Sequence, residues 1–192
     1  MDNYTVYHLH SHVSNLTAGT SADSITKFEQ YLDMAQHLGM SSVAFSEHGS
    51  VMNWVKKKEE TEKRGLKYIH ANEIYLTEEI GYDSEKDKLI LKRDNYHYML
   101  LAKNHDGVKE LNKLTSKTFN RTDGHFYYNP RVTFDELKAT SDNIIMTSAC
   151  LASPLWRLYK NDKNKFEDMV AWMETQKHRM FFEVQYHTHP EQ

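Results

Sequence analysis

The first feature that suggests chemistry is the run His8-Leu9-His10-Ser11-His12 near the start of the chain. Alternate residues of an extended strand point to the same side, so these imidazoles would share one face if residues 4–9 begin a strand that continues through them. Two neighbouring imidazoles can bind one metal ion. The pattern also fits an edge strand with polar residues on its solvent side, so the rest of the sequence has to decide.

Other candidate ligands follow further strand-like runs. His48 comes directly after one such run, Glu73 lies late in a second, and Cys150 follows a third. Each of these residues alone is more often a cap or a surface group than a ligand. In barrel-like βα folds, however, functional residues gather at the C-terminal ends of the strands, and His10 shares this placement. The group as a whole therefore indicates one shared site.

The elements that would position these residues alternate between strand-like and helix-like runs. Strands are expected at residues 4–9, 42–45, 66–76, 96–102, 143–147 and 180–186. Helices are expected from residue 23 or 24 to Gly39, and at residues 52–64, 108–114, 134–139 and 166–177, with a chain break at residues 129–131. This alternation predicts an α/β fold with a parallel sheet, of a (β/α) barrel-like type.

Composition limits the classes of function. A length of 192 residues suits one domain with its own core, so we expect a single domain over residues 1–192. A net charge of −3 argues against a protein that coats nucleic acid through bulk positive charge, but it leaves a local phosphate site open. The mixed-sign run at residues 56–64 is typical of a solvated helix face.

The expected setting is the cytoplasm. No window of the sequence is long and apolar enough to span a membrane, and the first residues do not resemble a secretory signal. Cys150 is the single cysteine and has no disulfide partner within the chain, which favours a reducing compartment.

The order of several motifs resembles the PHP (polymerase and histidinol phosphatase) family. The motifs are His-Leu-His-Ser at residues 8–11, Leu-Gly-Met at 38–40, Ser-Glu-His-Gly at 46–49 and Asn-Glu at 72–73. Within the family, the chain is similar to the PHP domain that begins the alpha subunit of bacterial DNA polymerase III, a C-family replicative polymerase. That closer similarity is carried by YHYMLLAKN at residues 96–104, TSACLA at 147–152, FFEVQ at 181–185 and PEQ at 190–192.

The resemblance implies a distorted, TIM-barrel-like (β/α) barrel that binds up to three divalent metal ions. Matched motif by motif, the metal ligands would be His8, His10, Asp23, His48, Glu73, His97 and Cys150. Catalysis is expected to depend on His8, His10, His48 and Glu73. Asp23 is matched by its distance from the Leu-Gly-Met helix end, and a helix N-cap is its alternative role. His97 opens its predicted strand, so the resemblance alone nominates it.

Several polar residues near the motifs are given other roles. Glu47 replaces the aspartate usual in the second motif and is expected to change a contact around a ligand rather than a ligand itself. His12 is a candidate for a supporting contact, and His70 is expected to be structural. His187 and His189 form another His-x-His pair that we do not assign to the site.

The family's later Asp-x-His motif has no match before Gln192. We therefore expect the domain to be truncated before its last strand, with at most seven of the family's nine ligand positions, and the polymerase domains to be absent. A cut-short piece of a longer protein is favoured over a natural short protein with an incomplete site.

Imidazoles, carboxylates and one thiolate suit Zn²⁺ or Mn²⁺ better than Mg²⁺. A cluster of such ions lowers the pKa of a bridging water and stabilises charge that develops on a phosphate, so the expected reaction class is phosphoester hydrolysis. The resemblance implies a metal-dependent 3′→5′ exonuclease within a DNA-directed DNA polymerase, with the DNA primer end, the polymerase domains and other replisome subunits as partners and no membrane. Two alternatives remain: a metal-free structural domain that braces the polymerase or docks a proofreading subunit, and a stand-alone phosphatase of the histidinol phosphate type.

Overall fold

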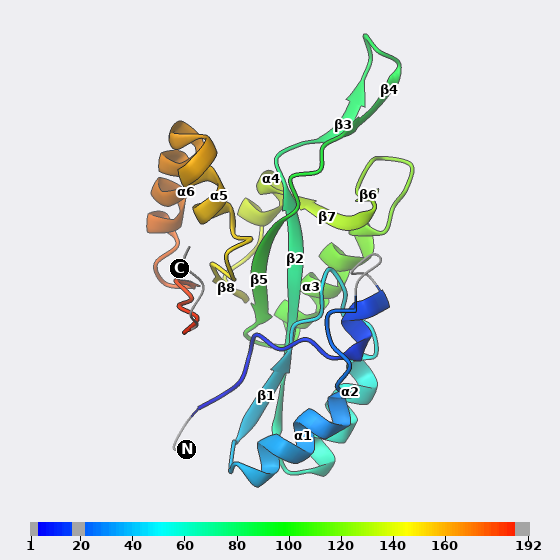
Figure 1. Cartoon of the computed structure of the whole chain (residues 1–192), viewed down its shortest axis with the longest axis vertical. Coiled ribbons are helices and arrows are strands. Elements are labelled where there is room, and N and C mark those ends of the chain that lie inside the picture. The colour runs from blue at the N-terminus through cyan, green and yellow to red at the C-terminus, as the bar shows by residue number, and fades with distance from the viewer. Residues whose placement is uncertain (1–3, 17–21, 187–192) are drawn as a thin grey trace.

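The structure is a computed structural model that describes residues 4–16 and 22–186, so His187 and His189 lie outside the described residues. One long strand, β2 (Lys67–Thr77), runs along the middle of an elongated molecule (Figure 1). It pairs with β1 (Ser42–Phe45) in parallel along its first part, with β5 (Tyr96–Ala102) antiparallel, and with β7 (Asn129–Thr133) in parallel near its end. This strand therefore organises the whole sheet.

Further strands extend the sheet to both sides. β8 (Ile144–Thr147) pairs antiparallel with β5, and β9 (Met180–Phe181) pairs in parallel with β8. On the other side, β6 (Phe126–Tyr127) pairs antiparallel with β7, which gives a seven-stranded mixed sheet. β3 (Ile80–Asp83) and β4 (Lys88–Leu91) form a separate hairpin that projects from the top of the molecule (Figure 1).

The α/β class is confirmed, but the expectation of a parallel sheet is wrong at β5, which runs antiparallel to both of its neighbours. A parallel return would need a crossover connection, usually a helix. Between β2 and β5 the chain forms the β3–β4 hairpin instead, which the sequence analysis missed, and it comes back in the opposite direction. Within the described residues the sheet stays open and does not close into a barrel.

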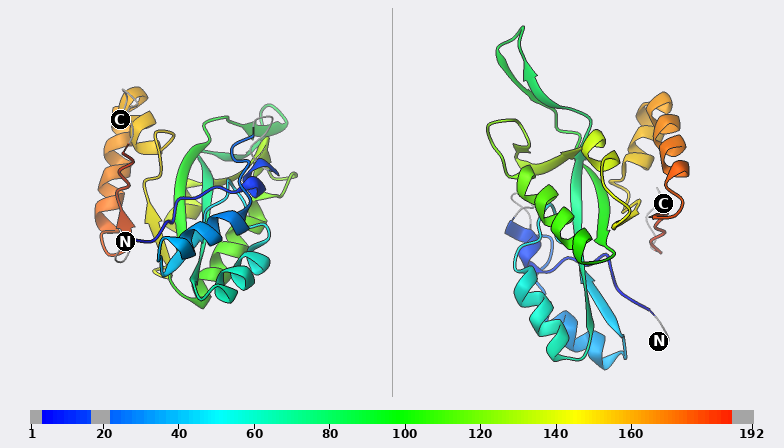
Figure 2. Two further views of the ribbon diagram at one scale, coloured as in Figure 1. Left: turned by 60° about the horizontal axis from the view of Figure 1, so that its bottom comes forward. Right: turned by 180° about the vertical axis from the view of Figure 1, so that it is seen from behind.

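Six α-helices and one short 3₁₀ helix surround the described sheet. They are η1 (His12–Leu16), α1 (Phe28–His37), α2 (Trp54–Lys63), α3 (His105–Thr118), α4 (Phe134–Lys138), α5 (Pro154–Asn161) and α6 (Lys163–Thr175). The view from behind shows α3 lying across one face of β2 and β5, with α5 and α6 side by side at the edge near β8 (Figure 2). No helix in the described part of the chain has the length and apolar character needed to cross a membrane.

Other sequence expectations need correction. Residues 4–9 form an extended segment joined to β1 by one bridge, between Val6 and Val43, rather than a full strand. Residues 129–131 belong to β7 instead of breaking the chain, helix α5 was missed, and β9 ends at Phe181. α1 begins at Phe28 with Lys27 as its N-cap, so Asp23 does not cap it.

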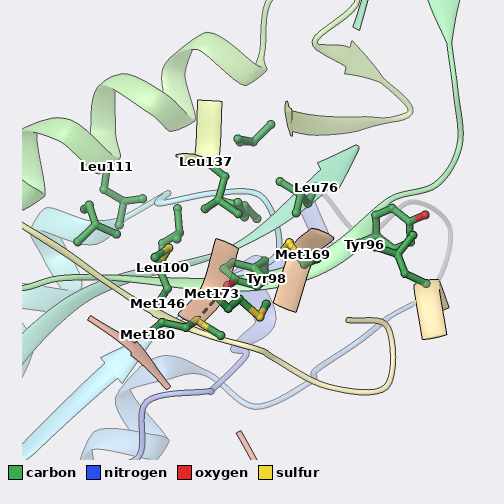
Figure 3. Packing of buried hydrophobic residues seen from close by; sticks show 14 residues of the cluster. Leu76, Tyr96, Tyr98, Leu100, Leu111, Leu137, Met146, Met169, Met173 and Met180 are labelled. Carbon is green, nitrogen blue, oxygen red and sulfur yellow. Dashed lines mark hydrogen bonds between the residues drawn. The ribbon is translucent and has the colours of Figure 1, made fainter. Parts of the chain in front are cut away.

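The two faces of β2 and β5 have different neighbours. Ile74, Leu76, Tyr98 and Leu100 point into a core shared with α3 to α6, drawn in Figure 3. Tyr98 donates a hydrogen bond from its hydroxyl to the sulfur of Met180, at 3.0 Å. Because side chains alternate along a strand, the intervening residues, Glu73 among them, face the opposite side, where a smaller cluster and the candidate site lie.

Gly49 sits where the loop after β1 touches β7. Its φ is +59°, and an added Cβ would lie 2.5 Å from Pro130 Cγ and 3.0 Å from the Tyr75 ring. Gly39 has a similar φ of +70° but open space around the same position. A side chain added at Gly39 would meet backbone strain alone, whereas one added at Gly49 would meet the same strain together with a steric conflict.

We expect Gly39→Ala to lower the free energy of unfolding by roughly 1–2 kcal/mol, because alanine disfavours the left-handed conformation. Gly49→Ala should cost about 1–3 kcal/mol more, because Pro130 and Tyr75 must also move. Urea unfolding of both variants measures the difference, and equal losses would contradict the tight packing at Gly49.

Candidate metal centre

A single buried carboxylate, that of Glu73, lies at the middle of the candidate site. Its Oε1 atom is 3.1 Å from His8 Nε2 and 3.2 Å from His97 Nδ1. Its Oε2 atom is 2.6 Å from His48 Nδ1 and 3.3 Å from His10 Nε2. Four imidazoles from distant parts of the sequence therefore surround one carboxylate.

The N-terminal segment delivers two of these imidazoles through pairing with the end of β1. Ser46 N donates to Leu9 O at 3.0 Å, and Leu9 N donates to the Ser46 hydroxyl at 2.9 Å. Leu9 is thereby fixed between His8 and His10, whose side chains both reach Glu73. Both imidazoles of the His-x-His pattern therefore lie beside Glu73, although the segment is not a regular strand.

His97 reaches the site because β5 is antiparallel to β2. In an antiparallel pair, the first residues of one strand lie beside the last residues of the other, and His97 is paired with Tyr75, two residues beyond Glu73. A residue that opens its strand is therefore placed at the same end as residues that close theirs. This geometry explains the position that the strand pattern alone did not predict.

Asp23 and Cys150 lie at the rim of the cluster. Asp23 Oδ2 is 2.9 Å from His48 Nε2, so His48 stands between two carboxylates. Cys150 Sγ is 3.7 Å from His97 Nδ1. All seven residues nominated from the sequence are thus brought together, with Glu73 central and these two peripheral.

Two residues that contact the cluster were missed as site residues. Glu183 Oε1 is 2.5 Å from His8 Nδ1, and its other oxygen accepts a hydrogen bond from Thr147 at 2.8 Å. Its signal was an acidic residue inside FFEVQ, within the strand expected at residues 180–186. Tyr75 packs against the rings of His48 and His97, with centroid distances of 5.8 and 5.2 Å. Its signal was a spacing of two from Glu73.

Glu47 anchors the loop that carries the first histidines. Its carboxylate is fully buried and accepts hydrogen bonds from the Ser11 backbone and from the hydroxyls of Ser11 and Ser14. Ser14 Oγ in turn lies 3.4 Å from His10 Nδ1 and accepts a hydrogen bond from His48 N at 3.1 Å. Glu47 therefore positions ligand candidates through Ser14, as its place in the sequence suggested.

Lys57 completes this network and corrects one expectation. Its ammonium is 2.5 Å from Glu47 Oε1, and its side chain is 2% exposed. The charged run was expected to be a solvated helix face, and pairs such as Lys58–Glu62 fit that description. Lys57 does not, because it turns inward to neutralise the buried Glu47.

The remaining histidines near the motifs lie elsewhere. His12 stacks its ring on Phe28, 6.2 Å away between centroids. His70 is buried, with Nε2 2.9 Å from Asn112 Oδ1 and Nδ1 3.0 Å from the Tyr68 hydroxyl. A structural role for His70 agrees with these contacts.

Burial and close charges shift the pKa values of the central groups. Burial alone would raise the pKa of Glu73, but the four imidazoles around it hold that pKa well below its usual range. Burial would lower the pKa of His8, yet Glu183 and Glu73 raise it to about 10. His97 is raised to about 9 against its burial, by Cys150 and Glu73. The cluster thus holds an ionised Glu73 carboxylate beside the protonated imidazoles of His8 and His97.

The donor set fits a divalent metal. The candidate ligand atoms of His8, His10 and Glu73 lie within 4.8 Å of one another, and so do those of His48, Glu73 and His97. In the described part of the chain, neither Glu73 oxygen has a hydrogen bond of acceptable geometry, despite the close imidazoles. Buried polar atoms are normally satisfied, and a metal ion would satisfy these. Imidazole nitrogens with carboxylate oxygens suit Zn²⁺ and Mn²⁺.

Comparison with known proteins shows the family of the chain. The family model described as PHP domain matches residues 7–187. The chain belongs to the PHP family. Among curated relatives, the DNA polymerase III subunit alpha of Borreliella burgdorferi is 35% identical over 161 residues, which cover 84% of this chain. The subunits of Chlamydia pneumoniae and Aquifex aeolicus are 32% and 28% identical over 76% and 85% of it.

The chain spans only 13%, 11% and 14% of the lengths of these three relatives. A crystal structure described as that of a metal-dependent phosphoesterase from Bifidobacterium adolescentis matches with a TM-score of 0.35 and 18% identity, over 60% of this chain and 33% of that chain. That likeness is too low to carry an argument.

The buried ion pair of this PHP chain predicts a strongly non-additive response to mutation. Lys57→Met should cost about 3–5 kcal/mol of unfolding free energy, because it leaves the Glu47 carboxylate buried and unpaired. Adding Glu47→Gln should recover part of that loss, because no uncompensated charge remains. Urea unfolding of the single and double variants measures the coupling; additive losses would mean that the two charges are independent.

Metal binding should release protons. His8 and His97, with pKa values of about 10 and 9, carry protons near neutral pH, and a metal ion must displace any proton from the nitrogen that it binds. The affinity for Mn²⁺ should therefore rise with pH, by at most about tenfold per pH unit for each displaced proton. Calorimetry in buffers of different ionisation enthalpy measures the release, and a pH-independent affinity would contradict the expectation.

Proposed function

We propose that the chain is a metal-dependent phosphoesterase domain. Its proposed ligands are His8, His10, Asp23, His48, Glu73, His97 and Cys150. The observation that carries the proposal is the buried Glu73 carboxylate, enclosed by four imidazoles and without a hydrogen bond among the described residues. Zn²⁺ or Mn²⁺ is the expected ion, ahead of Mg²⁺.

Bound divalent ions supply a hydroxide near neutral pH and stabilise the charge that develops on a phosphate. The chain's own residues hold and orient the site. Glu183 fixes the ring of His8 through Nδ1 and leaves Nε2 directed at Glu73. Ser14 and Glu47 steady His10 and His48, and the packed ring of Tyr75 restricts His48 and His97. Such supporting contacts raise ligand basicity and fix ring orientation.

The proposed substrate is the 3′ end of a DNA strand. The relatives are alpha subunits of DNA polymerase III, which supports a role in DNA replication as a single PHP domain of a larger polymerase. In this proposal the domain removes nucleotides in the 3′→5′ direction, in the cytoplasm, with the polymerase domains and other replisome subunits as partners.

Metal content is the first test. Protein purified without chelator should contain Zn or Mn by plasma mass spectrometry, and Glu73→Gln should lose most of it because the shared central carboxylate is gone. Glu79→Gln is the matched control, since the Glu79 side chain is 50% exposed and pairs with Lys92. Metal-free wild-type protein that stays metal-free after incubation with Mn²⁺ would favour the structural-scaffold alternative.

Hydrolysis is the second test. With Mn²⁺ present, a single-stranded oligonucleotide labelled at its 5′ end should give a ladder shortened from the 3′ end. His10→Ala should slow this by about a hundredfold or more, in the range found when a catalytic group is removed. His178→Ala, which removes an exposed histidine paired with Asp142, should have no effect. Equal rates of oligonucleotide hydrolysis for His10→Ala and His178→Ala would contradict the catalytic role of His10.

A further inference from the structure

A cavity opens directly beside the candidate metal centre. It has a volume of about 340 Å³, and its lining includes Cys150 and Glu183. Both residues also touch the cluster, Cys150 through His97 and Glu183 through His8. A phosphate held at the metal centre would therefore have this cavity as a neighbour.

Three aromatic side chains that lie outside the metal centre also line the cavity. Trp156 and Tyr159 project from α5, and Phe182 follows β9. The rings of Trp156 and Tyr159 are close to parallel, at 21°, with centroids 6.2 Å apart. Tyr159 and Phe182 are 59% and 66% exposed. Flat faces in this arrangement can stack with a planar ligand.

These aromatic rings lie outside the hydrophobic core of the described residues. Leu155 and Phe166, which also line the cavity, pack against the hydrophobic core of the described residues. Trp156, Tyr159 and Phe182 are not among the residues of that core. Leu155 and Phe166 thus pack with the core, whereas Trp156 and Phe182 lie outside it, and Tyr159 contacts Phe166 edge-to-face at 5.4 Å between centroids.

One cation lies next to the aromatic residues, and the lining of the cavity itself includes the Glu183 carboxylate. Lys160 Nζ lies 5.1 Å from the centroid of the Trp156 ring, so a cation stands beside the stacking surface. A second cavity, of about 330 Å³, is lined by Glu78, Glu79, Lys92 and Lys165 and includes none of the candidate ligands. The aromatic cavity is the one of the two that adjoins the proposed chemistry.

We propose that this cavity binds the nucleobase of the terminal nucleotide, through stacking on Trp156 and Tyr159. The inference rests on the proposed phosphoesterase function and adds a base subsite to it. Stacking on aromatic rings tolerates every base, because each base has a π-face. The subsite would thus accept a strand end without regard to sequence.

The test compares thymidine 5′-monophosphate with inorganic phosphate, each titrated by calorimetry into the Mn²⁺-loaded 192-residue chain. Tyr159→Ala and Trp156→Ala should each weaken thymidine 5′-monophosphate about tenfold, within the range measured for loss of base stacking. The affinity for phosphate should stay within about twofold, because the metal ligands are unchanged. Tyr159→Phe should retain nucleotide affinity, because it keeps the ring.

Tyr82→Ala on the β3–β4 hairpin is the matched control, since Tyr82 is 56% exposed, much like Tyr159. Tyr82→Ala should change neither the affinity for thymidine 5′-monophosphate nor the affinity for phosphate. Thermal unfolding of every variant checks that the fold is kept, and the separate phosphate titration distinguishes loss of the subsite from loss of the metal centre.

The subsite is overturned if Tyr159→Ala and Trp156→Ala leave nucleotide affinity unchanged, if they weaken both probes equally, or if the wild-type chain binds phosphate and thymidine 5′-monophosphate equally well. Those results leave the phosphoesterase function standing. If the chain instead binds neither Mn²⁺ nor phosphate, but binds free thymidine in a manner that depends on Tyr159, the proposed function fails while the base subsite survives.

Discussion

The arrangement of the segments around the site depends on the buried Glu73 carboxylate. It is fully buried on the strand at the centre of the sheet, and an ionised carboxylate in that position is costly unless charges or ligands compensate it. Four imidazoles supply that compensation, from the N-terminal segment, the loop after β1 and the start of β5. Segments far apart in the sequence are therefore tied to one point, where the imidazoles and the carboxylate are the proposed metal ligands.

A second buried carboxylate supports the first. The Glu47 backbone carbonyl accepts a hydrogen bond from Glu73 N at 3.2 Å, and the Glu47 carboxylate holds Ser11 and Ser14. Ser14 in turn contacts both His10 and the backbone of His48. Lys57 neutralises Glu47 from α2. The helix thus contributes to the site without supplying a ligand. The Glu47 side chain is long enough to contact the two serines and Lys57 at once. The glutamate in the second motif is therefore linked to the one lysine that turns inward from the otherwise solvated face of α2.

The sequence predicted the α/β class and grouped the candidate ligands, because His-x-His spacing and residues at strand ends are local patterns. It did not predict the direction of β5, because nothing local in residues 96–102 distinguishes a strand that returns through a hairpin from one that returns through a helix. The placement of His97 follows from that direction. The burial of Glu183 and Lys57 was missed for a related reason. A charged side chain is buried only where a partner on another element meets it, and these partners are His8 and Glu47 respectively.

The central claim is that the imidazoles around Glu73 form a metal centre. Anomalous diffraction from crystals of the chain grown with Mn²⁺ or Zn²⁺, collected at the absorption edge of the metal, tests it most directly. The account predicts anomalous peaks within bonding distance of Glu73 and at least two of His8, His10, His48 and His97. A fully loaded crystal with its peaks elsewhere, for example at exposed pairs such as His178 and Asp142, or with none at Glu73, would contradict it.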